Sequence, residues 1–533
     1  MSLKEKLKQR KYDEIWQEYC GFFDLDISEY MTIQKRLMLE QIGIWSNSAL
    51  GQSIIGKKNP ETIEEFLAMI PLTTYEDYAE MLLYKRDDLL PEHAILWLQT
   101  TWEGGVHPIK VAPYTKGMLD TYKNNIIAGL IICTSTEKGK FNISPKDKAL
   151  YGFAPLPFMT GLIPHALDDI IGLEFLPPIK EAEKMSFSQR NKVGFKLGFA
   201  KGIDFFFGMG SVAYYISKSL SSMGSGSGSK DTEVKYSPAM LIKIMKAKHR
   251  CKKEGRPLKP RDVFKLKGFV CAGTDNECYK DELEELWGIR PTEIFAGTEP
   301  TIIGVESWNK SGLYFFPDAC FYEFIPEAEM TKNFEDKEYQ PKTVLMDQVV
   351  PGERYELAVS VFKGGAFMRY RVGDVYQCLG LSSSEDGTKI PRFRYIDRMP
   401  DVIDIAGFTR ITENSINNVI ELSGLPITDW IAVKEFTKNN KPFLHMYVEI
   451  KPSAFSSNAI SSEIIREHMK VYFKYVDSDY NDLKQILGLE PLEITIVRCG
   501  TFEEYHSISG KKLRRVNPAL TDIKELLKTQ DTF

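Results

Sequence analysis

The feature that most constrains the fold lies in residues 355–374, where two alternating apolar runs flank a glycine turn. The segment comprises Tyr355 to Val361, the turn Lys363-Gly364-Gly365, and a second run with Phe367, Tyr370 and Val372. Period-two alternation on both sides of a glycine turn predicts a β-hairpin. The end of this hairpin would place Asp374 beside a tight glycine, Gly373. A carboxylate held there can accept hydrogen bonds from two vicinal hydroxyls, as a ribose requires, although a solvent-facing turn aspartate is the commoner structure.

A strand, a helix and a second strand follow one another over residues 269–297 and predict an α/β unit. The helix is expected from Asp281 to Leu286, and the last strand from Thr292 to Phe295. Glu299 comes after that strand in the sequence Phe-Ala-Gly-Thr-Glu, at the carboxyl end, where open α/β sheets bind ligands. A carboxylate there can hold Mg²⁺, which prefers carboxylate and phosphate oxygens.

Two further motifs lie toward the C-terminus. Arg398 and Asp401 flank Pro400, and the proline stiffens such a joint while the charges keep it exposed. Near the end of the chain, Gly510-Lys511 is followed three residues on by an arginine. Taken alone, that last segment is explained equally well as a basic surface tail.

The order of these motifs resembles the adenylate-forming superfamily of acyl-CoA synthetases, nonribosomal-peptide adenylation domains and luciferases. The order is aromatic-x-Gly-Thr-Glu, Tyr-Arg-x-Gly-Asp, an arginine before a short linker, and Gly-Lys. Within the superfamily the whole chain is most similar to the auxin-responsive acyl acid amido synthetases of plants (the Gretchen Hagen three family) and their bacterial relatives. The resemblance implies ATP- and Mg²⁺-dependent adenylation of a small carboxylic acid, followed by transfer of the acyl group to an amine such as that of an amino acid.

The same resemblance implies a role for each matched residue. Lys511 would be the catalytic lysine, with Lys512 as the near alternative, and Glu299 would hold Mg²⁺. The residues expected to bind the nucleotide are Thr100, Thr101 and Lys110 at the departing phosphates, Phe295 at the adenine face, Thr298 near the α-phosphate, Tyr370, and Asp374 with Arg398 at the ribose.

The segment Thr100 to Lys110 occupies the place of the superfamily's phosphate loop. Its hydroxyls, its glycines and its terminal lysine fit a loop that wraps phosphates with side chains and backbone N–H groups. Trp102, Glu103 and His107, however, stand where small or hydroxyl residues are expected. Glu103 beside a triphosphate would repel it. Either the loop takes a different path or triphosphate binding is weakened, and a simple glycine turn is the structural alternative.

Composition excludes several other classes of protein. A chain of 533 residues is too long for one core, and a net charge of -5 argues against general nucleic-acid binding. Ser2 to Tyr12 is too charged for a signal peptide, and the apolar run Ile126 to Cys133 is too short to span a bilayer. The eight cysteines include no CxxC pair, so free and mostly buried thiols in a reducing cytoplasm are expected.

The patterns together predict an α/β protein of two domains. A large N-terminal adenylation domain (1–398) would have a helical start (1–80), and a hinge at 399–401 would lead to a small mobile α+β domain (402–533). In the helical start, a helix is expected to begin at Pro60 with Asn59 as its N-cap. The small domain is expected to contain a hairpin-like start from Val402 to Thr412, a helix from Glu413 to Ser423, strands at Trp430–Phe436 and Phe443–Ile450, a helix at Ser462–Tyr475 and a strand at Leu492–Cys499.

Two other segments each admit two interpretations. Residues 151–230 are rich in aromatic and methionine side chains, which could line an apolar pocket for an acyl or aryl acid or could be plain core. Lys243 to Lys267 is strongly basic and could attract a polyanion or be a solvated helix face with its exit loop.

The sequence leaves three hypotheses about function. An acid amido synthetase is favoured, and a ligase that forms a thioester with CoA or a carrier thiol is the alternative enzyme. A degenerate adenylation fold without catalysis is the third, because of Trp102, Glu103 and His107. Neither the acid, nor the acceptor, nor the oligomeric state can be read from the sequence.

Overall fold

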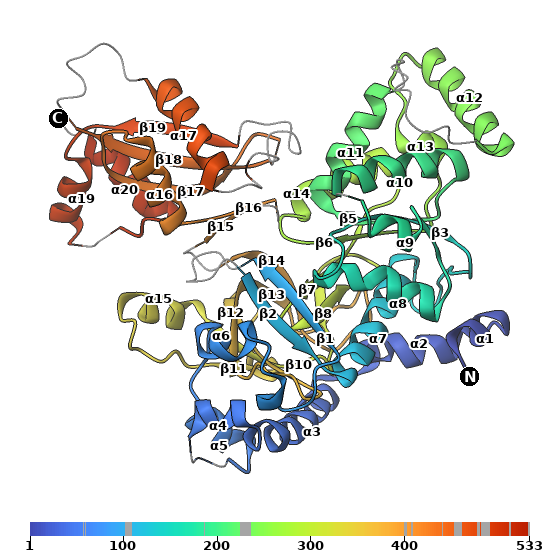
Figure 1. The fold of residues 1–533 in the computed structure, drawn as a ribbon, viewed down its shortest axis with the longest axis horizontal. Coiled ribbons are helices and arrows are strands. Elements are labelled where there is room, and N and C mark those ends of the chain that lie inside the picture. The colour runs from blue at the N-terminus through green and yellow to red at the C-terminus, as the bar shows by residue number, and fades with distance from the viewer. Residues whose placement is uncertain are drawn as a thin grey trace. The chain divides into compact units, whose positions relative to one another are not determined.

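Two compact units make up the chain in the computed structural model (Figure 1). The first contains residues 1–101, 109–273 and 280–396, and the second contains 274–279 and 397–533. The structure describes residues 1–56, 58, 60–101, 109–185, 187–223, 236–398, 402–406, 409–439, 441–451, 461–476, 480, 491–510 and 513–530. The expected hinge at 399–401 lies outside these ranges, so the predicted domain boundaries remain a prediction.

A twelve-stranded mixed sheet forms the centre of the first unit. Its strands are β3 (Lys148–Gly152), β4 (Glu174–Leu176), β5 (Phe205–Met209), β6 (Gly268–Ala272), β7 (Thr292–Gly297), β8 (Thr301–Glu306), β9 (Leu313–Phe315), β10 (Cys320–Pro326), β11 (Val344–Leu345), β12 (Arg354–Val361), β13 (Tyr370–Gly380) and β14 (Arg392–Arg398). They lie in the order β11-β10-β12-β13-β14-β9-β8-β7-β6-β5-β3-β4. β7 is parallel to β6 and antiparallel to β8, so the parallel and antiparallel halves meet at this strand.

The expected α/β unit and the expected hairpin are both confirmed in this sheet. The unit consists of β6, the helix α14 (Glu277–Trp287) and β7, and Glu299 follows β7 directly. The hairpin consists of β12 and β13, which pair in antiparallel register. A separate two-stranded sheet is formed by β1 (Leu96–Thr101) and β2 (Ile109–Tyr114).

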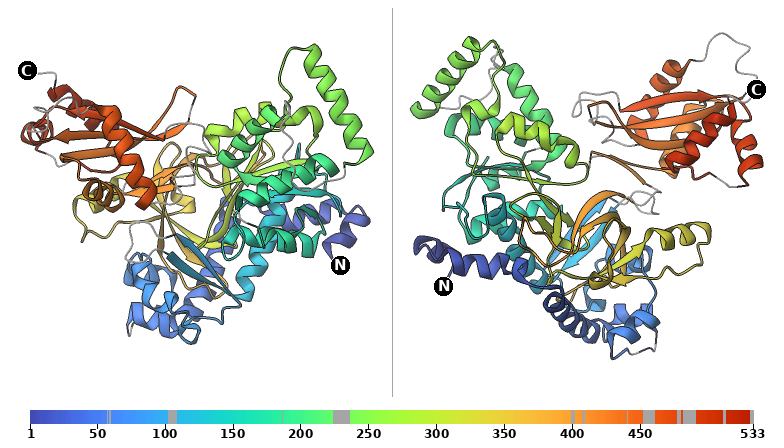
Figure 2. Two further views of the ribbon diagram at one scale, coloured as in Figure 1. Left: turned by 45° about the horizontal axis from the view of Figure 1, so that its top comes forward. Right: turned by 180° about the vertical axis from the view of Figure 1, so that it is seen from behind.

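Helices precede and interleave these strands. They are α1 (Leu3–Lys8), α2 (Tyr12–Cys20), η1 (Gly21–Asp24), α3 (Ile27–Ser46), α4 (Ala49–Ile55), α5 (Ile63–Met69), α6 (Glu76–Leu83), η2 (Asp87–Leu89), α7 (Lys116–Cys133), η3 (Met159–Gly161), α8 (Leu162–Ile170), α9 (Ile179–Ala182), α10 (Phe187–Lys201), α11 (Gly210–Met223), α12 (Pro238–Lys253), α13 (Pro260–Val263), α15 (Glu327–Glu335) and η4 (Met346–Gln348). The helical start is therefore confirmed. Figure 2 shows these first helices in blue, and α3 among them contacts β10 of the antiparallel half.

Buried hydrogen bonds fasten the long helix α3 to the antiparallel half. Gln34 donates to the carbonyls of Pro317 (2.5 Å) and Cys320 (2.7 Å), and Trp45 Nε1 donates to the carbonyl of Ala366 (2.9 Å). Polar groups this deeply buried are costly unless paired, so these contacts fix where the helix lies.

The expected cap of the third helix is wrong. α5 begins at Ile63, and the Thr62 hydroxyl accepts a hydrogen bond from the Glu65 backbone N–H (3.1 Å). Thr62 thus does what Asn59 was expected to do, because a threonine three residues before a glutamate is itself a strong helix start.

The apolar run from Ile126 to Cys133 belongs to α7, where it is buried, as the sequence predicts. None of the helices within the described ranges combines the length and the apolar composition that crossing a bilayer requires. Six of the eight cysteines, all of them free thiols, are buried, which confirms the expectation of mostly buried thiols.

The second unit follows the predicted α+β pattern closely. It contains β15 (Val402–Ile405), β16 (Thr409–Thr412), α16 (Glu413–Ser423), β17 (Ile427–Phe436), β18 (Pro442–Ile450), α17 (Ser462–Val476), β19 (Leu492–Val497), α19 (Thr501–Ser509) and α20 (Leu520–Gln530). α16 is capped by the Thr412 side chain and ends at Gly424 in the left-handed conformation, as expected. The sheet order is β17-β18-β19, and α19 and α20 supply core residues Phe502, Tyr505 and Leu526 that the sequence did not indicate.

A buried ion pair joins Arg369, just before β13, to Glu323 of β10, and Arg369 also binds the helical start. Arg369 contacts Glu323 through Nη2 (2.6 Å) and Nε (3.1 Å), and its Nη1 donates to the Leu67 carbonyl (2.7 Å). The two side chains are 7% and 0% exposed, so neither charge has access to water as an alternative partner.

Substitution Arg369→Ala should therefore lower the free energy of unfolding by about 3–5 kcal/mol, because it strands the Glu323 carboxylate in the core. Arg36→Ala is the matched control: Arg36 pairs with Glu40 on the surface, with side chains 62% and 54% exposed, and its loss should cost about 0.5 kcal/mol or less. Denaturant unfolding of both variants checks this, and equal stability of the two would contradict it.

Candidate active site

Lys110 lies on β2, which pairs with β1 in an antiparallel hairpin. In the β1–β2 pair, Thr100 lies opposite Lys110 and Thr101 opposite Ile109. The expected phosphate loop is therefore flanked by two antiparallel strands. Residues 102–108, which include Trp102, Glu103 and His107, lie outside the described part of the chain.

Three predicted residues from three distant segments meet in one cluster. Lys110 Nζ lies 3.0 Å from Glu299 Oε1 and 2.9 Å from the Tyr370 hydroxyl. That hydroxyl donates to the same Glu299 oxygen at 2.7 Å. The structure thus brings together the strand β2, the end of β7 and the start of β13. Both contacts fall on Oε1, and no other described residue donates to Oε2.

The electrostatics of the cluster keep Glu299 ionised. Burial raises the pKa of this carboxyl, but the Lys110 ammonium and the hydrogen bonds from Tyr370 and Lys110 outweigh burial and bring the pKa of Glu299 from 4.5 down to about 2. The side chains of Lys110 and Glu299 are 19% and 10% exposed, so the pair is largely shielded from solvent. Glu299 is therefore a carboxylate at neutral pH.

Residues 70–78 position this cluster. The Thr73 backbone N–H donates to the Arg369 carbonyl, and the Arg371 N–H donates to the Thr73 carbonyl, both at 2.9 Å, which places Thr73 as an extra strand residue beside Tyr370. The Tyr75 hydroxyl accepts from the Val111 N–H (2.5 Å), and its ring centroid lies 5.4 Å from Lys110 Nζ. The turn before α6 thus orients both Tyr370 and Lys110.

Asp374 is placed differently from the expectation. It is 2% exposed and lies inside β13, at a register shift between Glu356 and Ala358 of the partner strand, not at the end of the hairpin. The tight glycine is confirmed: Gly373 has a φ of +82°, and a side chain at this backbone conformation would be strained. β13 continues past the irregularity, because Val375 and Tyr376 resume pairing with β12. A bulge, rather than a turn, presents this carboxylate.

Phe295 and Thr298 both precede Glu299 on the same segment. The Phe295 ring is 5% exposed and lies roughly parallel to that of Tyr395, at 5.2 Å between centroids. The Thr298 carbonyl accepts a hydrogen bond from the buried Tyr114 hydroxyl at 2.9 Å. Tyr395, beside Phe295, is a half-buried aromatic residue that no motif in the sequence indicates.

Arg398 belongs to the second unit and lies among its charged groups. Its Nε is 3.7 Å from Asp404 Oδ2, and Arg410 Nε is 3.3 Å from the same oxygen. Although burial raises the pKa of Asp404, the Arg410 and Arg398 cations lower it on balance.

Lys434, which the sequence did not indicate, is buried among acids of the same unit. Its Nζ lies 2.6 Å from Asp275 Oδ1 and 3.7 Å from Asp397 Oδ1. Burial raises the pKa of Asp397 to about 6. A single lysine within an alternating strand gives no signal in the sequence that could have identified it.

Lys511 and Lys512 lie outside the described residues, so the catalytic assignment stays a prediction. Among the residues that are described, no three His, Cys, Asp or Glu side chains gather into a group that could hold a metal ion by themselves. A metal at Glu299 would therefore need oxygen ligands from a substrate.

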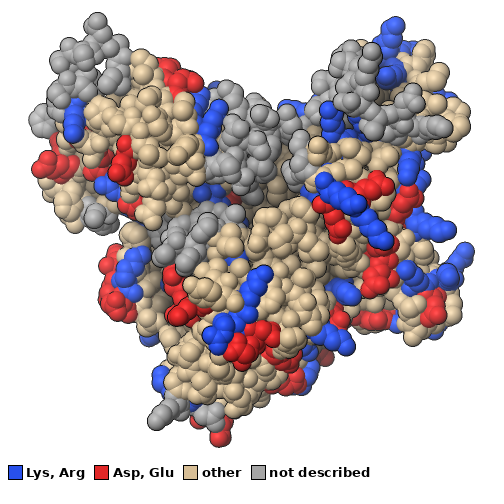
Figure 3. Space-filling view, viewed as in Figure 1, with Lys and Arg blue, Asp and Glu red and all other residues tan. Residues whose placement is uncertain are grey.

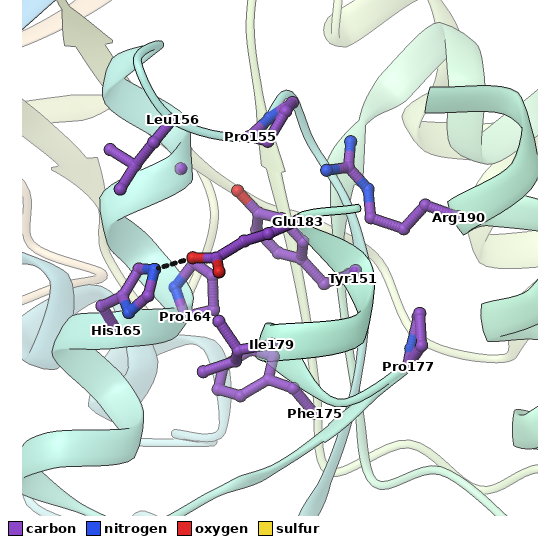
Figure 4. A pocket seen from close by; sticks show the side chains of 12 residues that line it. Tyr151, Pro155, Leu156, Pro164, His165, Phe175, Pro177, Ile179, Glu183 and Arg190 are labelled. Atoms are coloured by element: carbon purple, nitrogen blue, oxygen red, sulfur yellow. Dashed lines mark hydrogen bonds and ion pairs between the residues drawn. The ribbon is translucent and has the colours of Figure 1, made fainter. Parts of the chain in front are cut away.

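The aromatic residues between 151 and 230 are mostly core. Phe153, Met159 and the run Phe205–Phe207 are all buried. A cavity beside them is lined by Tyr151, Phe175 and Ile179, with His165 Nε2 3.0 Å from Glu183 Oε1 at its edge (Figure 4). Its volume of about 20 Å³ is large enough for a water molecule but too small for an acyl acid. The core interpretation is thus confirmed for these side chains.

Comparison with known proteins finds similarity to one family over part of the chain. Residues 313–409 match the GH3 family central domain. A jasmonoyl-L-amino acid synthetase, JAR4, of Nicotiana attenuata is 28% identical over 195 residues, which cover 35% of this chain and 30% of that protein. The indole-3-acetic acid-amido synthetase GH3.4 of Arabidopsis thaliana is 26% identical over 230 residues, covering 40% and 36%. The matched segments span about a third of these curated relatives.

Solved structures show the fold over nearly the whole chain. The acyl acid amido synthetase AtGH3.15 in complex with 2,4-DB superposes with a TM-score of 0.52 at 16% identity, covering 94% of this chain and 93% of that one. A 2-hydroxyisobutyryl-CoA ligase with 2-HIB-AMP and CoA superposes with a TM-score of 0.54 at 15% identity, covering 91% and 88%. The fold is therefore the mixed α/β fold of adenylate-forming ligases, as predicted.

Substitution Lys110→Met should remove the acid dependence that Glu299 gives to the free energy of unfolding. The fall of the Glu299 pKa from 4.5 to about 2 corresponds to roughly 3 kcal/mol. This stability is complete above the unfolded pKa and is lost as the pH falls toward 2, so roughly 1 kcal/mol should disappear between about pH 5.5 and about pH 3.5. Denaturant unfolding at several pH values in that window measures the slope.

Lys123→Met is the control for this prediction, because Lys123 makes only an exposed pair with Asp169 at 3.4 Å. It should keep the slope of the natural protein. A Lys110→Met variant that also kept it would show that the lysine does not control the ionisation of Glu299.

Proposed function

We propose that this chain, which carries the GH3 family central domain at residues 313–409 and has the fold of adenylate-forming ligases, is an ATP-dependent acyl acid amido synthetase. It would adenylate a carboxylic acid and transfer the acyl group to an amine, with an amino acid as the acceptor class. The observation that carries the proposal is the convergence of Lys110, Glu299 and Tyr370, because three segments that resemble nucleotide-binding motifs meet around one ionised carboxylate.

The chemistry needs cations where negative charge develops on phosphoryl oxygens. Lys110, held at 3.0 Å from Glu299, would exchange that carboxylate for the departing phosphates, with Thr100 on the facing strand as a hydroxyl donor beside Thr101. Asp374 and Arg398 would bind the ribose hydroxyls, Phe295 the adenine face, and Thr298 the α-phosphate. Lys511 would bring a second cation to the reacting carboxylate and phosphate.

The residues at the end of β7 fit Mg²⁺ in one respect. Glu299 is ionised at neutral pH, and its Oε2 accepts no hydrogen bond from another described residue, so one oxygen is available to a cation. Mg²⁺ commonly takes one or two protein carboxylates and completes its shell with phosphates and water. The bound metal would neutralise phosphate charge, and Glu299 would hold it.

A second candidate is a thioester-forming ligase, because the fold matches a CoA ligase as well as it matches an amido synthetase. Detection of an acyl-CoA product would decide for it. Failure to bind ATP would instead favour a non-catalytic protein. We further propose that the chain is a bacterial-type member of the family. Its location would be a reducing cytoplasm, which the buried free thiols support.

ATP–pyrophosphate exchange across a panel of carboxylic acids tests the first half-reaction without knowledge of the acceptor. The natural protein should catalyse exchange with at least one acid. Glu299→Gln should lower the rate by about 100-fold or more, because it removes the anionic metal ligand. Glu327→Gln removes an exposed carboxylate on α15, with its side chain 57% exposed, and should leave the rate unchanged. Loss of exchange in both variants, or in neither, would count against the role of Glu299.

Lys511→Ala should also cut exchange by about 100-fold or more, while ATP binding measured by calorimetry stays within a few-fold of the natural protein. The reason is that a catalytic lysine acts mainly on charge that develops during the reaction. Lys512→Ala is the matched control and should keep most of the activity. A reversed pattern would move the assignment to Lys512, and full activity of both would end it.

A further inference from the structure

A basic groove lies in the first unit between α12 and the strands β3, β5 and β6. It has a volume of about 760 Å³. Its cations are Lys148, Lys201, Lys243, Lys246, Arg250, Arg261 and Lys265. This concentration of positive charge stands out in a chain whose net charge is -5. Figure 3 shows Lys and Arg side chains exposed at the end of the molecule that carries α12.

One side of α12 lines the groove with positively charged residues. Lys243, Lys246 and Arg250 recur at intervals of three and four residues, so they share one side of the helix. Met240, Ala247 and Cys251 are buried and hold the helix against the unit. The groove is therefore built by a helix whose packing fixes where its cations lie.

The carboxylates of the groove are already engaged. Asp262 accepts two hydrogen bonds from Arg256, which lies outside the groove lining, at 2.7 and 2.8 Å. These bonds and the Lys259 backbone N–H hold the pKa of Asp262 well below its usual range. Asp204 Oδ2 accepts from the Lys148 backbone N–H at 2.9 Å. Within the described residues, neither acid forms an ion pair with Lys243, Lys246, Arg261 or Lys265.

Four of the groove cations have no ion-pair partner among the described residues. Within the described ranges, Lys243, Lys246, Arg261 and Lys265 make no ion pair and no hydrogen bond, whereas Lys201 pairs with Glu174 and Arg250 with Asp262. All four are exposed. Like charges left side by side repel one another, so an anion that bridges them would be bound favourably.

The groove is separate from the candidate active site. Lys148 is the first residue of β3, Asp204 immediately precedes β5, and Lys265 shortly precedes β6. These parallel strands place the groove at the amino-terminal edge of the sheet, whereas Glu299 follows the carboxyl end of β7. The two sites thus lie at opposite edges of the same parallel half.

We propose that this groove binds a polyanion carrying at least two phosphate groups. Guanidinium and ammonium groups together match phosphate oxygens, and the volume suits a ligand of nucleotide size or the headgroups of anionic lipids. Exposed Leu241, Ile242 and Met245 on the same helix are the reason to test the lipid source alongside the free phosphate.

Calorimetric titration with inorganic tripolyphosphate, and co-sedimentation with phosphatidylglycerol vesicles, test the proposal on the full chain. A triple variant Lys243→Gln, Lys246→Gln, Arg261→Gln should weaken binding of the bound probe by about 10-fold or more. The control triple Lys248→Gln, Lys252→Gln, Lys253→Gln removes the same charge from exposed positions of α12 that do not line the groove, and should weaken it less than about 2-fold. Thermal melting verifies that both triples fold.

Each outcome bears on the proposal. If the groove triple variant, but not the control, loses binding of tripolyphosphate, the ligand is a soluble phosphate compound. If it loses only vesicle binding, the ligand is the headgroups of anionic lipids. Equal loss in both triples, or no binding of either probe, overturns the groove as a site. Lys110→Met should leave tripolyphosphate binding at the groove intact, so that failure here is distinct from failure of the proposed nucleotide site.

Discussion

The structure of the candidate site depends on one buried interaction, the contact of Lys110 and Tyr370 with a single oxygen of Glu299. A carboxylate this deeply buried would ordinarily hold its proton, and a lone lysine would be equally costly. Together they keep opposite charges in a shielded place, and the tyrosine hydroxyl adds a directional hydrogen bond. The residues that a nucleotide would contact are thus charged and oriented before any ligand arrives, which is the condition for electrostatic catalysis.

The rest of the first unit serves to bring these three side chains to one point. Glu299 stands where the parallel half of the sheet gives way to the antiparallel half. Lys110 comes from a separate hairpin, whose strand β2 is held by Tyr75, and Tyr370 is fixed by the backbone bridge to Thr73. Contacts between segments almost 300 residues apart therefore set distances that no local sequence could set, and the buried Arg369–Glu323 pair ties the same helical start to the sheet.

Local patterns predicted local structure well. The hairpin of β12 and β13, the unit around α14 and most elements of the second unit follow from alternation, caps and glycine stops, all of which act within a few residues. Predictions from the sequence were wrong or missing where tertiary contacts determine the position of a residue. Asp374 sits in a bulge because β13 continues beyond Gly373, and Thr62 rather than Asn59 caps α5. Lys434, buried among Asp275 and Asp397, gave no signal because its partners lie far away in the chain.

Photolabelling with 8-azido-ATP and Mg²⁺, followed by peptide mapping, tests most directly whether these segments form one nucleotide site. If the segments form one site, label should fall on the peptides containing Phe295 or its neighbour Tyr395, and excess ATP should prevent labelling. Label confined to other parts of the chain, such as the basic groove at α12, or label that ATP does not displace, would contradict it.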